Sequence, residues 1–393
     1  MLQSPLEWTA KPSRRPSHDG TGAIRKPGAR PRPIDPAMSV QTVIRGSGMF
    51  LPDGVVTNER LSRLMDTNDA WIQQRTGIRE RRYARKGTSS VDLGVEAARA
   101  ALDDAGLDAR DIDLVVFATM TPAHYFPGNG GIAAAALGLS TTHAIDVRMQ
   151  CAGFLSGLQI CDAFIRSGTH RRILLVGAEC HASFYPWTDA EWRVMFGESD
   201  EPVSPKMFAI GTALRDRAVI FGDAGGAFVL EANDSGDGRG FLGFEMRTDG
   251  TQWDKLYVPA GGSASFPYFS PDMFESMATI PIVEGRQVFK LATTAMPAIV
   301  REILLGHGLE VSDLDLLLMH QANLRINESV QKTLGLPDEK VFNNIQKYGN
   351  TTAATLPLVF HEAKQAGKAR SGDLVCFTAL GAGLHWGAGL VRM

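Results

Sequence analysis

Three residue types in this sequence could together carry out nucleophilic chemistry: a cysteine, a histidine and an asparagine. Cys151 follows a strand-like run that ends at Asp146, and the apolar residues after it recur at helical spacing. This pattern predicts a sharp turn at, or just inside, the N-terminus of a buried helix, where the helix dipole favours thiolate over thiol. A cysteine in such a place is, on its own merits, more often a buried structural residue, so other parts of the chain must distinguish the two roles.

The histidine and the asparagine stand at the ends of other predicted elements. His320 directly follows the strand-like run 316–319, and the carboxyl ends of strands are where α/β sheets place their active sites. Asn350 stands at a glycine-marked turn before a helix of small residues, where by itself it would be a helix cap. Cysteine, histidine and asparagine can build either a cysteine hydrolase or an acyl-transfer enzyme, and their spacing leaves both open.

The elements that must position these residues occur twice. Residues 95–117 are predicted to form a helix, a Gly-Leu break and a buried strand, and residues 297–319 repeat this plan. The residues of the connecting loop repeat as well, which a coincidence of two ordinary helix–strand units would not explain. The duplication predicts two similar α/β halves packed around a pseudo-twofold axis.

The composition is that of an ordinary soluble enzyme, with 44% hydrophobic and 21% charged residues and a net charge of −3. A chain of 393 residues can bury a large core, in one big domain or two fused halves. No apolar run is long enough to span a bilayer, and no signal-peptide pattern precedes the first domain. The four cysteines form no CxxC pair and are too scattered for a disulfide framework, so we expect no structural zinc and a cytoplasmic location.

Residues 1–38 differ from the other parts of the chain, because prolines alternate there with lysines and arginines and little can be buried. Their charge would suit a nucleic acid or a membrane surface, but the composition favours a disordered leader, and translation could even begin at Met38. We therefore expect a leader (1–38), an N-terminal half with the cysteine (39–235) and a C-terminal half with the histidine and the asparagine (236–393).

Six motifs occur along the chain in the order of a known family: WIQQRTGIRERR, DVRMQCAGF, FGDAGGA, HQANLRI, YGNTTAAT and GAGLHWGAG. By these motifs the chain resembles the β-ketoacyl-acyl carrier protein synthase III family of thiolase-fold condensing enzymes, from about Val40 to the C-terminus. The resemblance implies an α/β thiolase fold, with two duplicated halves in a five-layered αβαβα arrangement.

By this resemblance, the catalytic residues are Cys151, His320 and Asn350. Cys151 would accept an acyl group from an acyl-thioester, within an oxyanion hole formed by its own N–H and that of Gly383. The histidine and the asparagine would stabilise the enolate that remains when malonyl-acyl carrier protein loses carbon dioxide, and the enolate would then attack the acyl-cysteine. The product would be a β-ketoacyl thioester that starts a fatty-acid or polyketide chain.

The resemblance also implies partners and binding residues. We expect coenzyme A and acyl carrier protein thioesters as substrates, a homodimer, no permanently bound cofactor or metal, and no nucleic-acid or membrane partner. Trp71 and Arg75 would bind the adenine and phosphates of coenzyme A. A second phosphate-binding arginine should lie near the end of segment 181–217, where Arg215 and Arg217 both stand, and of these we take Arg217.

Three further residues receive roles in the same way. Asn323 is expected to contact pantetheine, and Arg325 to form part of the surface that docks the carrier protein. Phe126 resembles the aromatic residue that closes the acyl pocket across the dimer interface. Segment 181–217 is longer than the family's housekeeping members have, and its six large aromatics predict either a pocket wall that sets substrate choice or a lid that packs only on protein.

Other functions remain open at this stage. The chain could be a stand-alone acyltransferase, or an enzyme that joins two acyl chains. The absence of Asp and Glu from 119–126 disfavours the joining of chains, since those members use a carboxylate there. From different classes, it could be a cysteine thioester hydrolase or a non-catalytic acyl-binding protein, and the intact cysteine, histidine and asparagine disfavour the latter.

Overall fold

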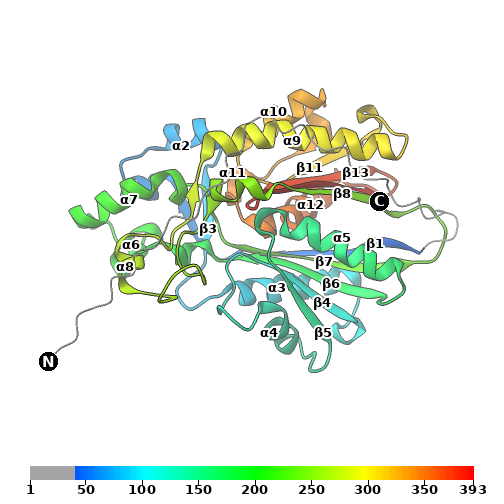
Figure 1. The fold of residues 1–393 in the computed structure, drawn as a ribbon, viewed down its shortest axis with the longest axis horizontal. Coiled ribbons are helices and arrows are strands. Elements are labelled where there is room, and N and C mark those ends of the chain that lie inside the picture. Colours follow the sequence, from blue (N-terminus) through cyan, green and yellow to red (C-terminus); the bar gives the residue numbers. More distant parts are fainter. Residues whose placement is uncertain (1–39) are drawn as a thin grey trace. The chain divides into compact units, whose positions relative to one another are not determined.

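The structure is a computed structural model that describes residues 40–393, so the predicted leader (1–38) lies outside the described residues. Two five-stranded mixed sheets dominate these residues, and both have the same topology (Figure 1). The first sheet has the order β1 (Gln41–Phe50), β7 (Ala224–Asn233), β6 (Arg172–Glu179), β4 (Leu114–Ala118) and β5 (His143–Val147). The second has the order β8 (Gly240–Thr248), β14 (His385–Arg392), β13 (Leu374–Gly381), β11 (Leu316–Met319) and β12 (Val341–Phe342).

Strand directions repeat as well as strand order. In each sheet the last three strands of these orders are parallel, and the first two are antiparallel to their neighbours. The predicted duplication is therefore confirmed at the level of topology. The predicted boundary between residues 235 and 236 falls in the loop from β7 to β8 and stays a prediction, because residues 39–393 form one compact unit.

Helices cover both outer faces of the two sheets and fill the layer between them. The outer helix of the first half contacts β1, β7 and β6, and the outer helix of the second half contacts β14, β13 and β8. The two central helices contact strands of both sheets, which completes the predicted five-layered αβαβα arrangement. The outer helices are α3 (Ser90–Ala105) and α4 (Asn129–Ala136) on one side and α9 (Gly285–Gly306) and α10 (Leu324–Leu334) on the other, and the central ones are α5 (Gly153–Arg166) and α12 (Thr355–Gln365).

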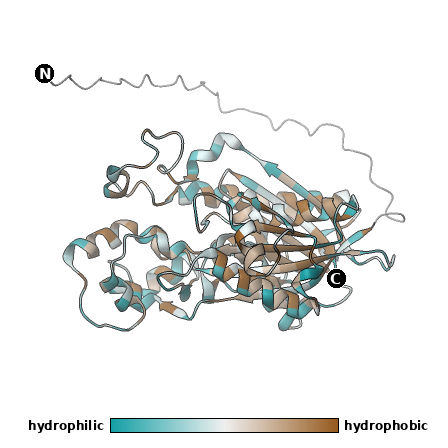
Figure 2. Ribbon diagram, turned by 90° about the horizontal axis from the view of Figure 1, so that it is seen from below, coloured by the Kyte–Doolittle hydropathy of each residue, from teal (hydrophilic) through white to brown (hydrophobic). Residues whose placement is uncertain are grey.

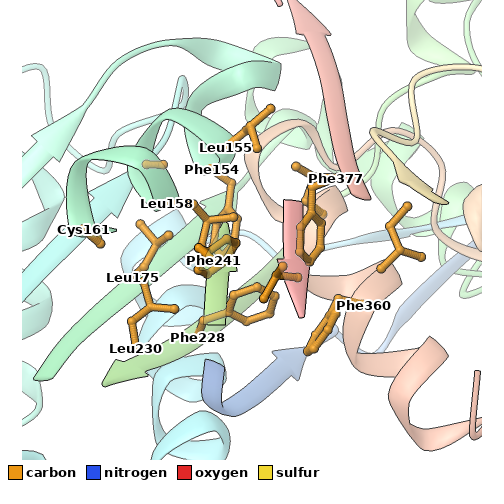
Figure 3. Close-up of a cluster of buried hydrophobic side chains, with 14 of the residues drawn as sticks. Phe154, Leu155, Leu158, Cys161, Leu175, Phe228, Leu230, Phe241, Phe360 and Phe377 are labelled. Carbon is orange, nitrogen blue, oxygen red and sulfur yellow. The ribbon is translucent and has the colours of Figure 1, made fainter. Parts of the chain in front are cut away.

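The central layer holds a continuous apolar core (Figure 3). Phe154 on α5 and Phe360 on α12 meet Phe228 of the first sheet, with ring centroids 5.0 and 4.9 Å apart, and Phe360 also lies 5.7 Å from Phe377 of the second sheet. Strands β4, β6, β11 and β13 are apolar along nearly their whole length because helices cover both of their faces, and Figure 2 shows the apolar ribbon gathered in the sheets. Among residues 40–393, no helix is both long and apolar enough to cross a membrane.

The remaining elements lie at the carboxyl ends of the parallel strands and form a second region, which includes segment 181–217. Most of the aromatic side chains of this segment pack on protein: Tyr185 and Trp187 are buried and stacked on each other, and Trp192 contacts the ring of Tyr83. The lid interpretation is therefore favoured over an open pocket wall. The elements of this region are β2 (Gly54–Thr57), α1 (Asn58–Ser62), α2 (Asp69–Thr76), β3 (Glu80–Tyr83), α6 (Asp189–Met195), α7 (Pro205–Ala218), β9 (Leu256–Tyr257), α8 (Pro271–Glu275), β10 (Ile282–Val283) and α11 (Ile345–Tyr348).

The close approach of β6 to the turn before α12 gives a testable consequence. A methyl group on Gly177 would lie 2.5 Å from the carbonyl oxygen of Ala353 and 2.8 Å from the ring of Phe154. We predict that Gly177→Ala lowers the free energy of unfolding by about 1–3 kcal/mol, as overpacking does in tight cores. Gly131→Ala is the matched control, because its methyl would meet nothing within 4 Å and a helical alanine adds stability. Urea unfolding measures both, and an unchanged stability of Gly177→Ala would contradict the packing described.

Candidate active site

Cys151 lies in the predicted place, in a single 3-10 turn (Gln150–Ala152) directly before α5. Gln150 in this turn has a φ of 45°, a conformation that costs energy for any residue except glycine. The strained turn brings the cysteine to the carboxyl end of the parallel strands, and only 7% of its surface is exposed. Such strain at a cysteine is typical of a functional turn rather than of a structural core position.

The turn 350–355 connects the cysteine to the other two predicted residues. The Asn350 Oδ1 accepts the backbone N–H of Thr352 at 2.8 Å, and residues 352–354 contact the 3-10 turn that carries Cys151. At the end of the turn, the Thr355 Oγ1 lies 2.6 Å from the Nδ1 of His320. Cys151, His320 and Asn350 thus gather around one turn, although they are far apart in the sequence.

The end of β13 packs directly on Cys151. A methyl group on Gly381 would lie 2.9 Å from the Cys151 Cβ, so only glycine permits this approach. Gly383, two residues further on, lies against the ring of His385. Its role as the second oxyanion donor stays a prediction.

The environment of Cys151 favours the thiol over the thiolate at rest. Burial, and then the negative charge of Glu179, raise the pKa of Cys151 to about 12, although the hydrogen bonds from Thr352 and Ala382 oppose this. Glu179 ends β6 and accepts hydrogen bonds from the Thr121 hydroxyl and the Met120 N–H. The predicted resting thiolate is therefore wrong for this state of the protein, because the helix start does not outweigh the cost of burying a charge.

His320 is a neutral imidazole with one nitrogen available. Burial lowers its pKa to about 3, and its Nε2 is buried without a hydrogen-bond partner. The backbone N–H of His320 donates to the Thr378 carbonyl on β13 at 2.9 Å, which fixes the end of β11. A buried, unpartnered ring nitrogen is costly, so it is expected to meet a substrate group.

A second group of predicted residues surrounds α2. The Arg75 guanidinium lies 4.2 Å from the centre of the Trp71 ring, and that of Arg215 lies 5.1 Å from it. Arg217 is instead bonded to the Pro281 carbonyl and lines a cavity of about 330 Å³ between α7 and residues 259–282. Of the two arginines near the end of segment 181–217, Arg215 is thus the one at the Trp71 ring, and the assignment of Arg217 as the second phosphate ligand stays a prediction.

The last three predicted residues differ in how far the structure supports them. Asn323 and Arg325 begin α10 and bond to backbone carbonyls of α2: Asn323 to that of Arg75 at 3.0 Å, and Arg325 to that of Gln74 at 3.0 Å. They lie beside the Trp71 face, but their side chains already bond to protein. Phe126 is 81% exposed and contacts the ring of Tyr125.

Sequence reasoning missed four residues of the site: Thr352, Thr355, Glu179 and His181. The two threonines stand inside a quoted motif but were not distinguished from their neighbours, since only the fold shows that their hydroxyls meet His181 and His320. Glu179 is the last residue of the central strand β6, and His181 stands two residues further on. The rule that directed attention to His320, a polar residue at the carboxyl end of a parallel strand, could have found both.

The fold and the buried cysteine at the start of α5 together define a thiolase-fold condensing enzyme, and comparisons with known proteins agree. Residues 145–199 match the family profile of 3-oxoacyl-[acyl-carrier-protein (ACP)] synthase III, and residues 304–393 match the profile of its C-terminal part. A β-ketoacyl-[acyl-carrier-protein] synthase III of Hyphomonas neptunium is 38% identical over 360 residues, which cover 91% of this chain and 100% of the relative. The chain therefore belongs to the β-ketoacyl-[acyl-carrier-protein] synthase III family, and it is an acyltransferase of the condensing type.

Solved structures agree with this assignment. The 3-oxoacyl-[acyl-carrier-protein] synthase III of Aquifex aeolicus VF5 has a TM-score of 0.75 and 34% identity, and the match covers 90% of this chain and 100% of that one. The priming β-ketosynthase from the R1128 polyketide pathway has a TM-score of 0.75 at 28% identity, over 93% of this chain and 99% of that one.

The protonation state of Cys151 gives a prediction. Because the pKa of Cys151 is raised, the thiolate is a minor species at neutral pH. As long as the pH stays below this pKa, the thiolate fraction grows about tenfold for each unit by which the pH rises. We predict that alkylation of Cys151 by iodoacetamide accelerates continuously between about pH 7 and pH 9. Peptide mass spectrometry measures the rate at this site, with Cys151→Ser as the control for assignment. A rate that levels off below about pH 8 would show that the thiolate already dominates in the resting enzyme.

Proposed function

We propose that this enzyme transfers an acyl group from an acyl-coenzyme A to Cys151 and condenses it with the enolate formed from malonyl-acyl carrier protein. The observation that carries the proposal is the turn 350–355. It contains Asn350, contacts the 3-10 turn that carries Cys151, and holds the His320 ring through the Thr355 hydroxyl. A nucleophile and two further polar groups thereby converge on one buried place, as a two-step transfer requires.

In the first half-reaction, the Cys151 sulfur attacks the thioester carbonyl, and negative charge develops on the carbonyl oxygen. The N–H of Cys151 and a backbone N–H of the turn 381–383 are the proposed donors to that oxygen, since this turn packs on Cys151 through Gly381. Backbone donors that are fixed before the reaction stabilise such a charge without any reorganisation. The tetrahedral intermediate then expels the donor thiol and leaves the acyl group on Cys151.

In the second half-reaction, His320 and Asn350 donate to the thioester oxygen of the malonyl group as carbon dioxide leaves. Asn350 uses its Oδ1 within the turn, so its Nδ2 amide is the end that can donate. The Thr355 hydroxyl donates to the Thr352 carbonyl at 2.9 Å, so its oxygen accepts the Nδ1–H of His320 at 2.6 Å. The Nε2 of the neutral ring then carries no proton, and in the proposed step it becomes a donor when the Thr355 hydroxyl turns from the carbonyl to Nδ1 and the ring proton stands on Nε2.

The proposed entrance for both thioesters is the face around Trp71. The indole ring suits stacking on adenine, and Arg75 and Arg215 offer charge to phosphates. Arg325 and Asn323 border the same face and would meet the carrier protein and the pantetheine arm. No three His, Cys, Asp or Glu side chains form a metal-binding cluster in residues 40–393, and we propose catalysis without a permanent cofactor.

We also propose that the enzyme works as a homodimer. Strand β5 is the edge of the first sheet, so its outer backbone groups are not paired within that sheet. An exposed aromatic cluster is formed by Tyr125, Phe126, Tyr268 and Phe269, with ring centroids 5.1 to 6.3 Å apart between neighbours. A second copy would pair the strand edge and cover the aromatics, and Phe126 would then reach the partner's acyl pocket. We place the enzyme in the cytoplasm, where its four free cysteines stay reduced.

The two half-reactions can be separated by substitution at Asn350. We predict that Asn350→Ala slows the release of carbon dioxide from malonyl-acyl carrier protein by about a hundredfold or more, the effect of removing one donor to a developing oxyanion. Loading of Cys151 from acyl-coenzyme A should be much less affected, because the asparagine does not bond to the sulfur. Radioactive carbon dioxide release and intact-protein mass measure the two steps. Equal losses in both steps would mean that Asn350 only caps its turn.

A further inference from the structure

His385 opens β14, and the proposed mechanism does not use it. Its position follows from the register of three antiparallel strands, because it lies directly opposite Gly381 of β13 on one side and Thr248 of β8 on the other. Residues opposite each other in antiparallel strands project from the same face of a sheet. A methyl group on Gly381 would lie 2.9 Å from the Cys151 Cβ, so this row of residues faces the nucleophile.

The neighbouring residues confirm which face this is. The next row on the same face joins Ala379, Gly387 and Met246, and the side chains of Ala379 and Met246 belong to the central apolar core. Trp386, between the two rows, packs instead on the outer cluster around α9. His385 therefore projects into the central layer, at the end of the sheet where the active site lies.

The imidazole of His385 has one bonded nitrogen and one available nitrogen. Its Nδ1 lies 2.9 Å from the Thr248 Oγ1, and the ring covers Gly383 so closely that a methyl group there would collide with the Nε2. No residue within 40–393 hydrogen-bonds to this Nε2, and the side chain is half-buried. Burial lowers the pKa of His385, so the ring is neutral at pH 7. Because the Thr248 hydroxyl can donate or accept, the Nε2 can also act in either role.

The strand order places His385 and His320 on opposite sides of Cys151. In the second sheet β13 lies between β11 and β14, and these strands carry His320, Gly381 and His385 at their active-site ends. The proposed entrance borders α10, which follows His320 in the chain. A thioester that enters from this side directs its thiol arm toward His320 and its acyl chain toward His385.

The spacing of the strands indicates which part of the acyl chain meets the ring. Neighbouring strands lie about 4.8 Å apart, so the ring stands roughly that far beyond the position of Gly381 that packs on Cys151. An extended acyl chain covers a similar distance between the cysteine sulfur and an oxygen on its third carbon.

We propose that His385 is a specificity-determining residue that contacts the acyl group on Cys151 and favours acyl chains with a hydroxyl group on the third carbon. This inference rests on the proposed function and deepens it by naming a class of substrate. A neutral imidazole offers a hydrogen bond without a charge, which suits a hydroxyl group better than a carboxylate. A hydrocarbon chain would exclude water from the Nε2 and leave it without a partner, which is unfavourable.

The test compares two acyl groups of equal length in the full-length enzyme. Intact-protein mass measures the loading of Cys151 from racemic 3-hydroxybutyryl-coenzyme A and from butyryl-coenzyme A. We expect the hydroxylated group to load about three- to tenfold faster, the effect of one net hydrogen bond. His385→Leu removes the hydrogen bond at similar size and should abolish or reverse this preference. His385→Gln keeps a hydrogen-bonding group near the position of the Nε2 and should retain most of it.

The readout is the ratio of the two loading rates, which does not change if part of a variant is unfolded. Trp386→Phe is the matched control, because this neighbour on the same strand faces the outer layer and its substitution should leave the ratio unchanged.

Three results would overturn the proposal. The first is equal loading of the two acyl groups by the unsubstituted enzyme. The second is an unchanged ratio in His385→Leu, which would leave His385 as a packing partner of Gly383, and the third is an equal loss of the preference in Trp386→Phe. Failure of the unsubstituted enzyme to load either group would instead refute the proposed function, so the two failures are distinguishable.

Discussion

The turn 350–355 is the constraint on which the site depends. Thr352 adopts a left-handed conformation and its hydroxyl meets the Nε2 of His181 at 2.7 Å, while Thr355 starts α12 and reaches His320. The turn is held from the other side of the molecule, because the Asn350 backbone bonds to Ile220 and Gly222 just before β7. The two halves of the fold are thus joined at the point where their residues must react together.

Burial determines the electrostatics of this site. Cys151, His181 and His320 are all neutral at rest, because taking a charge out of water costs more than the surrounding hydrogen bonds return. Asp223 accepts several N–H groups, yet burial raises its pKa to about 7. A site of this kind does not store a reactive thiolate. It forms the thiolate only while the substrate carbonyl is present, which limits side reactions with water and oxidants.

The sequence was sufficient for the architecture and for the residues that react. The repeat of 95–117 in 297–319 predicted two α/β halves because helix and strand periods are strong local signals, and the sheets confirm it. The choice between neighbouring residues depended on the direction in which each side chain points, and the spacing of residues in the sequence does not give that direction. Arg215 and Arg217 are two positions apart on one helix and face different sides, and only the fold shows which side meets Trp71. His181 contacts Thr352 across 171 positions, which no local pattern reveals.

The central claim is that Cys151 carries the acyl group, and intact-protein mass after incubation with an acyl-coenzyme A tests it most directly. The account predicts one added acyl group on the unsubstituted enzyme and on Cys161→Ala, whose sulfur is buried on the same helix in the apolar core. It predicts none on Cys151→Ala. A Cys151→Ala protein that still gains the acyl mass would contradict it.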